Sequence, residues 1–275
     1  MNRKDKEICI VGKPERKSRI FAQETCHMEL LKISAVSYLN TFPFVFGIRE
    51  SGLLQNFTLE LDVPSICAEK LKNGTVDIAL VPVGALPGIR QFHYISDHCI
   101  GAVGEVKTVL LLSNVPLEKI NQVYLDYDSR TSVKLVKVLA KKYWKIDPQW
   151  KNLKSGEALS TVDLESLVAI GDKTFGIRPN FPYVYDLAEA WINYTGLPFV
   201  FAAWVSRKKL DDDRLLQFTR ALAWGVSHKG ESLEYFRDKL PACDDCLSYL
   251  ENNISYDFDE KKKEGLSKFL GYLSE

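Results

Sequence analysis

Residues 57–83 read FTLELDVPSICAEKLKNGTVDIALVPV, and this stretch decides the fold class. Residues 57–63 alternate apolar and polar side chains, which is the pattern of a half-buried strand. Pro64 stands where a helix begins and Gly74 where one ends. The apolar run at residues 77–83 then predicts a buried strand. A strand, a helix and a second strand at this spacing predict a right-handed crossover between parallel strands, so the chain is of the α/β class.

The pattern continues on both sides of this unit. Upstream, LLKISAV (residues 30–36) predicts a strand, and a helix follows from about Pro43 to Glu50. Downstream, a second α/β unit is predicted, and from Asp211 onward the chain turns helical. The elements of the second unit are a strand at 122–128, a helix at 129–144, a strand at 166–176, a helix at 184–196 and a strand at 197–207.

Two α/β units followed by helices without a sheet of their own predict two lobes. We expect residues 28–113 and 200–275 to form the first lobe, with the closing helices packed on it, and residues 114–199 to form the second. The chain would then cross twice between the lobes, and a ligand would bind in the cleft between them, as in hinged binding proteins. A single doubly wound domain is the competing interpretation.

Composition limits the classes of function. The 275 residues are 46% apolar and 26% charged, and Lys plus Arg balances Asp plus Glu at 36 each, so no global field attracts nucleic acid or a membrane surface. No apolar run approaches the roughly 18 residues of a membrane span. Residues 1–27 are charged, lack the apolar core of a signal peptide, and are expected to be a dispensable extension. The six cysteines are scattered, which together with these features favours a cytoplasmic protein.

The strongest local feature is DYDSRTSV (residues 126–133), which follows a strand and opens a helix with Ser129, Arg130, Thr131 and Ser132. Free amide groups, the positive helix end and three hydroxyls suit a carboxylate, to which Arg130 could add a bidentate contact. Because no Gly-rich loop accompanies it, a carboxylate is favoured over a nucleotide. The alternative is an ordinary helix cap.

Asn40 raises a similar choice, because it lies between the first strand and the first helix. It either caps that helix or stands at the carboxyl end of a strand, where open α/β sheets place their ligands.

Other candidates are weaker. CDDC at residues 243–246 has the spacing of zinc and redox motifs but no second pair and no matching histidine. His93 and His98 are expected to be structural. No set of nucleophile and base is evident, and the chain shows little sign of a strong base. We expect neither a metal nor a cofactor.

Seven segments carry a resemblance that covers about nine-tenths of the chain. In order they are VSYLNTFP, NGTVDIALVPV, GAVGEVKTVLLLS, DSRTSVKLVKVLA, AIGDKTF, DLAEAWINYTGLPFVFAAWV and NISYDFDEKKKEGLSKFL. Together they resemble the chorismate dehydratases of the futalosine route to menaquinone. The departures are mild: VPVGALPGI lacks the serines common after that strand, and Thr108 stands where a serine is commoner.

The resemblance implies a type II periplasmic-binding-protein fold and a hydro-lyase that converts chorismate to 3-[(1-carboxyvinyl)oxy]benzoate and water, without a cofactor. It implies a catalytic role for Asn40, which would hold a substrate oxygen while the substrate's own enolpyruvyl carboxylate takes the proton. The substrate-binding residues that we expect are Ser37, Thr41, Thr108, Ser129, Arg130, Thr131, Ser132, Gly171 and Asp172.

Two other functions stay open at this point. One is a non-catalytic receptor for small carboxylates with the same fold. The other is the related 1,4-dihydroxy-6-naphthoate synthase, which usually opens with a Ser-Cys-Pro-Asn-Asp type motif that this chain lacks. The oligomeric state is also left open, a homodimer included.

Overall fold

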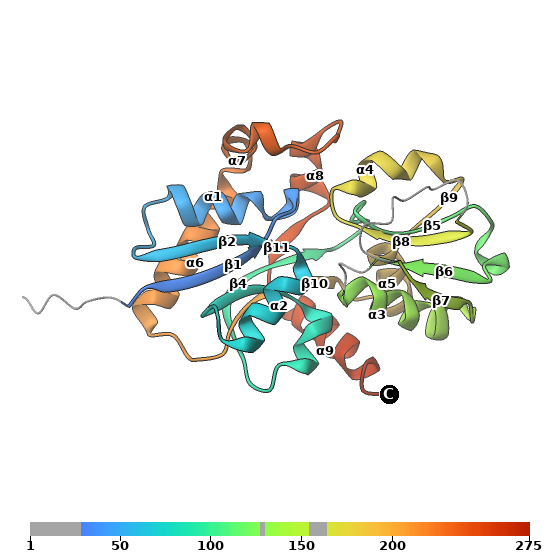
Figure 1. The fold of residues 1–275 in the computed structure, drawn as a ribbon, viewed down its shortest axis with the longest axis horizontal. Coiled ribbons are helices and arrows are strands. Elements are labelled where there is room, and N and C mark those ends of the chain that lie inside the picture. The colour runs from blue at the N-terminus through green and yellow to red at the C-terminus, as the bar shows by residue number, and fades with distance from the viewer. Residues whose placement is uncertain (1–28, 127–129, 154–163) are drawn as a thin grey trace, which may run out of the picture.

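A computed structural model describes residues 29–126, 130–153 and 164–275, which form two lobes side by side (Figure 1). The strands of the first sheet are β1 (Leu31–Val36), β2 (Phe57–Asp62), β3 (Ile78–Pro82), β4 (His93–Ala102), β10 (Phe199–Ser206) and β11 (Ser255–Asp257). The strands of the second are β5 (Val109–Ser113), β6 (Gln122–Leu125), β7 (Gln149–Asn152), β8 (Ser166–Ile170) and β9 (Tyr183–Asp186).

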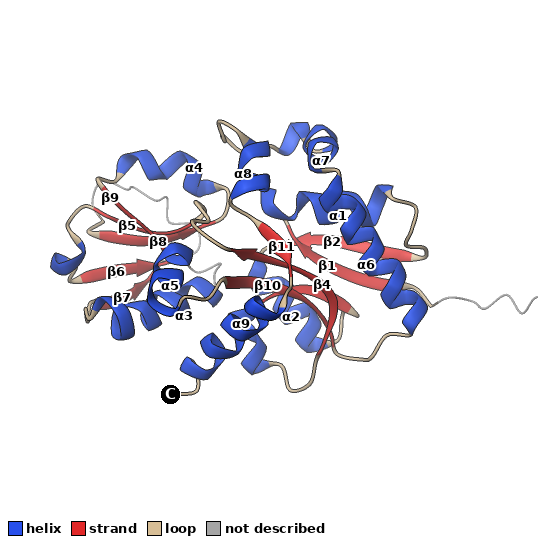
Figure 2. Cartoon of the chain, turned by 180° about the vertical axis from the view of Figure 1, so that it is seen from behind, coloured by secondary structure: helices blue, strands red, loops and turns tan. Residues whose placement is uncertain are grey.

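Helices cover both sheets. They are α1 (Phe42–Glu50), α2 (Pro64–Asn73), α3 (Arg130–Leu139), α4 (Lys173–Ile177), α5 (Leu187–Thr195), α6 (Asp212–Ser227), α7 (Lys229–Tyr235), α8 (Cys246–Asn252) and α9 (Glu260–Tyr272). In the first lobe, α1 and α6 lie on one face of the sheet, and α2 and α9 lie on the other (Figure 2). Among the described residues, no helix is both long and apolar enough to span a membrane.

The unit predicted from residues 57–83 forms as expected. In the first sheet, whose strand order is β11-β4-β10-β3-β1-β2, β1 pairs in parallel with β2 and β3. Pro64 is the first residue of α2, and Gly74 ends that helix with φ of +73°, a left-handed conformation that glycine adopts without strain. All residues of β3 are buried, as its continuous apolar sequence requires.

The boundary between the lobes differs from the expected one. β5 pairs with β8 and β9 in the second sheet, whose order is β7-β6-β8-β5-β9, so residues 109–113 belong to the second lobe and not to the first. The first connection between the lobes is therefore residues 103–108, which we call the crossover segment. The second runs from α5 to β10, which returns the chain antiparallel to β3 and β4. An apolar strand is buried equally well in either sheet, so apolarity alone could not assign β5.

Glycines permit the closing helices to pack tightly on the first lobe. A Cβ atom on Gly47 of α1 would lie 2.0 Å from the Ala221 carbonyl oxygen of α6, and one on Gly225 would lie 1.9 Å from the Pro43 oxygen. The two helices can approach this closely because neither glycine has a side chain. Between these helices and the sheet, the Trp204 ring of β10 packs edge-on against Phe44 of α1 and Phe218 of α6, with ring centroids 5.8 and 5.1 Å apart.

Asp186 fixes the crossover segment. Its Oδ2 accepts the Val106 and Lys107 amides at 2.9 and 2.7 Å, while Oδ1 caps α5 through the Ala188 and Glu189 amides at 3.0 and 3.1 Å. The same carboxylate thereby holds both an N-terminal helix end and the chain that joins the lobes. Asp186 precedes α5 as its N-cap instead of lying inside the helix predicted at residues 184–196, so this role was not predicted.

Candidate active site

A cavity of about 550 Å³, part of it open to solvent, lies between the two lobes. Its apolar lining consists of Val36, Pro64, Leu80, Pro82, Ile100, Val106, Val109, Ile170, Phe201 and Ala202. Its polar lining consists of Tyr38, Asn40, Thr41, Thr108, Thr131 and Ser132, and Gly171 completes the wall. Among the described residues, no Lys, Arg, His, Asp or Glu lines the cavity. The chemistry available at this surface is therefore that of hydroxyls, amides and a phenol.

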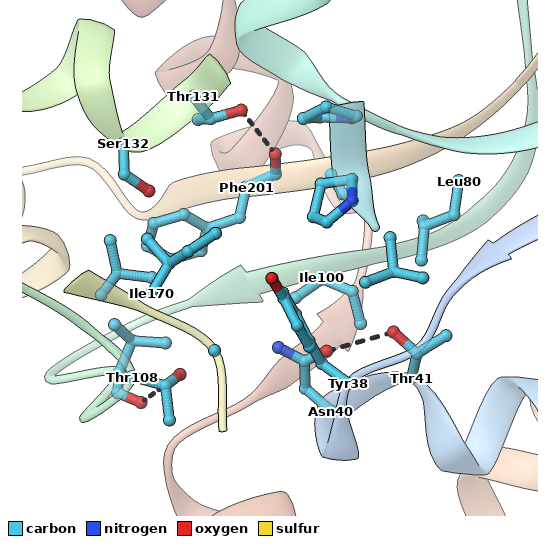
Figure 3. A pocket seen from close by; sticks show the side chains of 17 residues that line it. Tyr38, Asn40, Thr41, Leu80, Ile100, Thr108, Thr131, Ser132, Ile170 and Phe201 are labelled. Carbon is cyan, nitrogen blue, oxygen red and sulfur yellow. Dashed lines mark hydrogen bonds between the residues drawn. The ribbon is translucent and has the colours of Figure 1, made fainter. Parts of the chain in front are cut away.

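Asn40 faces this cavity from the short 3₁₀ turn Leu39–Thr41, which joins β1 to α1 (Figure 3). The Thr41 hydroxyl donates to Asn40 Oδ1 at 3.1 Å, so the Nδ2 group, which carries two hydrogens, is the donor end of the side chain. Neither the turn nor α1 has a side-chain cap. Asn40 therefore does not cap this helix, and it lines the cavity just after the first strand, at the end of the sheet where α/β folds place their ligands.

Two buried tyrosines of the C-terminal region surround Asn40. The Tyr256 hydroxyl donates to the Asn40 carbonyl oxygen at 2.9 Å. The Tyr249 hydroxyl lies 2.8 Å from Thr108 Oγ1 and also contacts the Asn40 side chain. Burial raises the pKa of Tyr249, and its hydrogen bonds with Thr108 and Asn40 partly offset that rise. Asn40 belongs to the first lobe and Thr108 ends the crossover segment, so Tyr249 bridges the site and the connection between the lobes.

The N-terminus of α3 forms the opposite wall. Thr131 Oγ1 accepts the Gly84 amide at 3.0 Å and donates to the Phe201 carbonyl at 3.1 Å, while Ser132 points toward the cavity (Figure 3). Position 84 requires glycine because the Cβ atom of any other residue would lie 2.6 Å from the Arg130 carbonyl oxygen. The Gly84 oxygen in turn accepts from the Lys134 ammonium at 2.8 Å. The helix end is thus held firmly against the loop after β3, with a hydroxyl directed at the ligand space.

The lobes are held together at the cavity by two contacts of residues 171–172. Asp172 accepts the Leu39 amide with both oxygens, at 3.1 and 3.0 Å; we call this pair the interlobe clasp. Burial raises the pKa of Asp172 to about 6, and the Leu39 hydrogen bond opposes that rise. Next to the clasp, the Tyr38 ring packs flat on Gly171, where a Cβ atom would come within 2.8 Å of the ring. Gly171 also has φ of +69°, so both the close contact with the Tyr38 ring and the left-handed backbone require glycine at this position.

The structure brings most of the predicted site residues together but not all. Asn40, Thr41, Thr108, Thr131, Ser132 and Gly171 line the cavity, and Asp172 lies next to it in the clasp. Ser37 is exposed and does not line the cavity. Ser129 lies outside the described residues.

Arg130 is the main departure from the predicted anion site. Its guanidinium pairs with Glu69 of α2 at 2.7 Å, both side chains being about half exposed, and it does not line the cavity. The side chain at the first position of α3 projects outward to the neighbouring helix, while Thr131 and Ser132 turn inward. The carboxylate site expected at this helix therefore consists of hydroxyls and amides without the arginine.

The remaining sequence candidates lie elsewhere. His98 is buried, and its Nδ1 pairs with Asp97 at 2.6 Å, in keeping with a structural role. No cluster of three or more His, Cys, Asp and Glu side chains that could hold a metal ion occurs in the described part of the chain. Tyr249 and Tyr256 were not predicted because they lie far from Asn40 in the sequence. Tyr256 falls within the segment NISYDF that carries the resemblance, but nothing in that pattern assigns its hydroxyl to the site.

Comparison with solved structures defines the class. A protein of Archaeoglobus fulgidus superposes with a TM-score of 0.70 at 12% identity, over 90% of this chain and 98% of that one. The periplasmic aliphatic sulphonate binding protein SsuA of Escherichia coli superposes with a TM-score of 0.59 at 16% identity, over 90% and 93% of the two chains. The fold is thus that of the periplasmic-binding proteins, two α/β lobes around a cleft, which confirms the predicted fold class.

Sequence comparison then places the chain within a family. Residues 31–275 match the family described as menaquinone biosynthesis, and the chain belongs to it. A chorismate dehydratase of Thermus thermophilus is 27% identical over 253 residues, which cover 84% of this chain and 91% of that protein.

Proposed function

We propose that this protein is a chorismate dehydratase, a hydro-lyase that converts chorismate to 3-[(1-carboxyvinyl)oxy]benzoate and water in the futalosine route to menaquinone. Its family and the Thermus thermophilus relative support the reaction class. The observation that carries the proposal is the cavity lining, which offers one carboxamide and several hydroxyls in an apolar wall.

The substrate fits these groups by its chemistry. Chorismate carries two carboxylates, a ring alcohol and an enol ether on a ring of carbon and hydrogen. The α3 end, with Ser132 and the positive end of the helix dipole, suits one carboxylate. The apolar wall, which includes Phe201 and Ile170, suits the ring. Charge-neutral donors suffice here because amide and hydroxyl hydrogen bonds to an ionised group are stronger than those between neutral groups.

In the proposed elimination, a base removes the proton at C3, the electron pair of that bond forms the new ring double bond, and the C4–oxygen bond breaks. The departing hydroxyl takes up the proton that the base removed from C3, so that it leaves as water, the base is regenerated and the ring becomes aromatic. Because no charged side chain lines the cavity among the described residues, the substrate's own enolpyruvyl carboxylate is the base that we propose. Such a weak base is adequate when it is held in place, since positioning can contribute up to roughly 7–11 kcal/mol.

Asn40 has the donor that this step needs. Its Oδ1 accepts from Thr41, so Nδ2 is the donor of this cavity-lining side chain, and in the proposed reaction it holds the C4 oxygen or the carboxylate. Tyr256 and Tyr249 hold the backbone and the side chain of Asn40 in this position. The interlobe clasp holds the two lobes together next to the cavity, which keeps the groups of both lobes in place around the substrate.

One assay tests the proposal. Purified protein is incubated with chorismate, and the aromatic enol ether is sought by mass spectrometry and proton NMR, with heat-denatured protein as the control. Formation of the product at a rate proportional to protein concentration supports the dehydratase. The likeness to SsuA favours a second candidate, a non-catalytic carboxylate-binding protein. Saturable calorimetric binding of chorismate with no product would establish that candidate and reject the enzyme.

A further inference from the structure

The motif CDDC (residues 243–246) forms a tight turn directly before α8. Asp244 and Asp245 occupy the turn, and Cys246 is the first residue of the helix. A turn of this size brings its first and fourth Cα atoms within about 7 Å, which is close to the separation of about 4.4–6.8 Å that a disulfide needs. The Cys246 thiol already points back toward Cys243, whose carbonyl oxygen lies 3.8 Å from Cys246 Sγ.

These two thiols differ from the other described cysteines in their surroundings. Cys67 and Cys99 are fully buried, whereas Cys243 and Cys246 are only partly buried at the surface of the core. A reagent of small size can therefore reach the pair at residues 243 and 246. Both thiols are free in this structure.

The helix that starts at Cys246 connects the first lobe to the crossover segment. Tyr249 contacts Thr108 at 2.8 Å, and the Asn253 side chain at the end of α8 donates to the Glu105 carbonyl oxygen at 3.1 Å. On its other side, the Tyr249 ring packs edge-on against Phe175 of α4 in the second lobe, with centroids 5.3 Å apart. Figures 1 and 2 both show α8 beside α4. The position of α8 thus affects how the two lobes are held together.

We propose that Cys243 and Cys246 form a reversible disulfide that fastens the start of α8 and so restrains the crossover segment. The oxidant is a small disulfide such as glutathione disulfide. One protein thiolate attacks it, which forms a mixed disulfide and releases one small thiol. The second protein thiol loses its proton and attacks the mixed disulfide, which closes the protein S–S bond and releases the second small thiol. Two protein thiols are oxidised, and one small disulfide is reduced to two thiols.

Burial and neighbouring groups affect how readily the Cys246 thiol loses its proton. Burial, the Cys243 thiol and the carboxylates of Asp172 and Asp245 together raise the pKa of Cys246 to about 12. Cys246 is therefore a poor source of thiolate, and Cys243 is the thiol that attacks the oxidant. Ring closure, in which Cys246 must lose its proton, is therefore expected to be slow.

The site is tested by thiol trapping and mass spectrometry. A full-length variant with Cys9→Ser and Cys26→Ser is equilibrated in glutathione buffers of increasing oxidised fraction, alkylated and digested. We expect the peptide that contains residues 243–246 to lose two hydrogens and escape alkylation. The further change Cys243→Ser should abolish this product. Alkylation of both thiols in the most oxidising buffer, or a glutathione adduct at Cys243 that never closes, would overturn the proposal.

Its consequence is tested by hydrogen exchange on the same oxidised and reduced samples, which requires no substrate and no assumption about the reaction. A covalent ring of this length reduces the freedom of the locally unfolded helix, so the amides of residues 249–253 should exchange about tenfold more slowly when oxidised. The crossover segment should slow with them, and α2 should not change. Equal exchange of α8 and of residues 103–108 in both states would show that the disulfide restrains nothing and would refute the coupling.

Discussion

Replacing Asn40 with serine separates a catalytic role from a structural one. The substitution replaces the carboxamide with a hydroxyl, shortens the side chain and removes Nδ2, the donor of this cavity-lining residue. The backbone bond from Tyr256 to the Asn40 carbonyl oxygen stays in place, since it does not involve the side chain. What is lost is the side-chain contact with Thr41, the contact with Tyr249, and the donor to the substrate.

The expected magnitudes differ for stability and for turnover. Leaving a buried polar partner unsatisfied costs about 1–3 kcal/mol, which lowers the melting temperature of a chain of this size by about 2–4 °C per kcal/mol. Loss of one donor that stabilises developing charge lowers kcat by about 10²–10³-fold. Chorismate affinity should fall by no more than about tenfold, the worth of a single neutral hydrogen bond.

The assay measures kcat by product formation, Kd by titration calorimetry and the melting temperature by circular dichroism, for the parent and for Asn40→Ser. Asn114→Ser is the matched control. Its side chain also donates one hydrogen bond, to the Leu164 carbonyl at 2.7 Å, but it is exposed and does not line the cavity. We expect the control to retain the kcat of the parent. A folded Asn40→Ser protein with kcat within about threefold of the parent would refute the catalytic role.

Three further sets of variants test the same geometry. Tyr249→Phe should lower the melting temperature and reduce kcat about tenfold at unchanged fold, because the hydroxyl that holds Asn40 is lost, whereas an unaffected kcat would exclude this positioning role. The pKa of Asp172 is about 6 in the folded chain and near 3.8 in the unfolded chain, so the folded chain binds this proton more tightly. The free energy of unfolding, measured by urea titration relative to Asp172→Asn, should therefore fall by up to about 3 kcal/mol as the pH rises from 4 to 6. A difference that does not change with pH would contradict the burial of this carboxyl group. Arg130→Ala should change chorismate affinity less than threefold, because Arg130 pairs with Glu69 outside the cavity. Ser132→Ala should weaken the affinity about tenfold, because Ser132 lines the cavity. If calorimetry gives the reverse order, the arginine lies in the site.

Much of the fold was predictable because periodicity reports burial directly. The alternation of residues 57–63, Pro64 at a helix start and Gly74 at its end each act over a few residues, and all three are found as predicted. Strands β7, β9 and β11 were missed, and each holds only three or four residues, which gives a periodic pattern little room to develop. The longer strand β4 was also not predicted, because its register shifts against β10 and its burial does not alternate regularly.

The candidate site was predictable where it follows from topology. Asn40 ends the first parallel strand and Ser132 opens a helix, and both positions face the cleft in an α/β fold of this kind. The direction of a side chain within such a segment was not predictable. Arg130 and Thr131 are neighbours in the same first turn, yet the first reaches Glu69 outside the cavity and the second lies in its wall.

The sequence by itself determined which segments become strands and helices, the two-lobed class and the polar residues at the strand and helix ends that form the cavity. Only the tertiary structure decided which groups hold those residues in place. Tyr256 reaches Asn40 across 216 residues of sequence, and Asp172 reaches Leu39 across 133. No local pattern encodes such contacts, because hydrogen bonds between distant segments depend on how the two sheets and the closing helices pack, and that packing is a property of the whole chain.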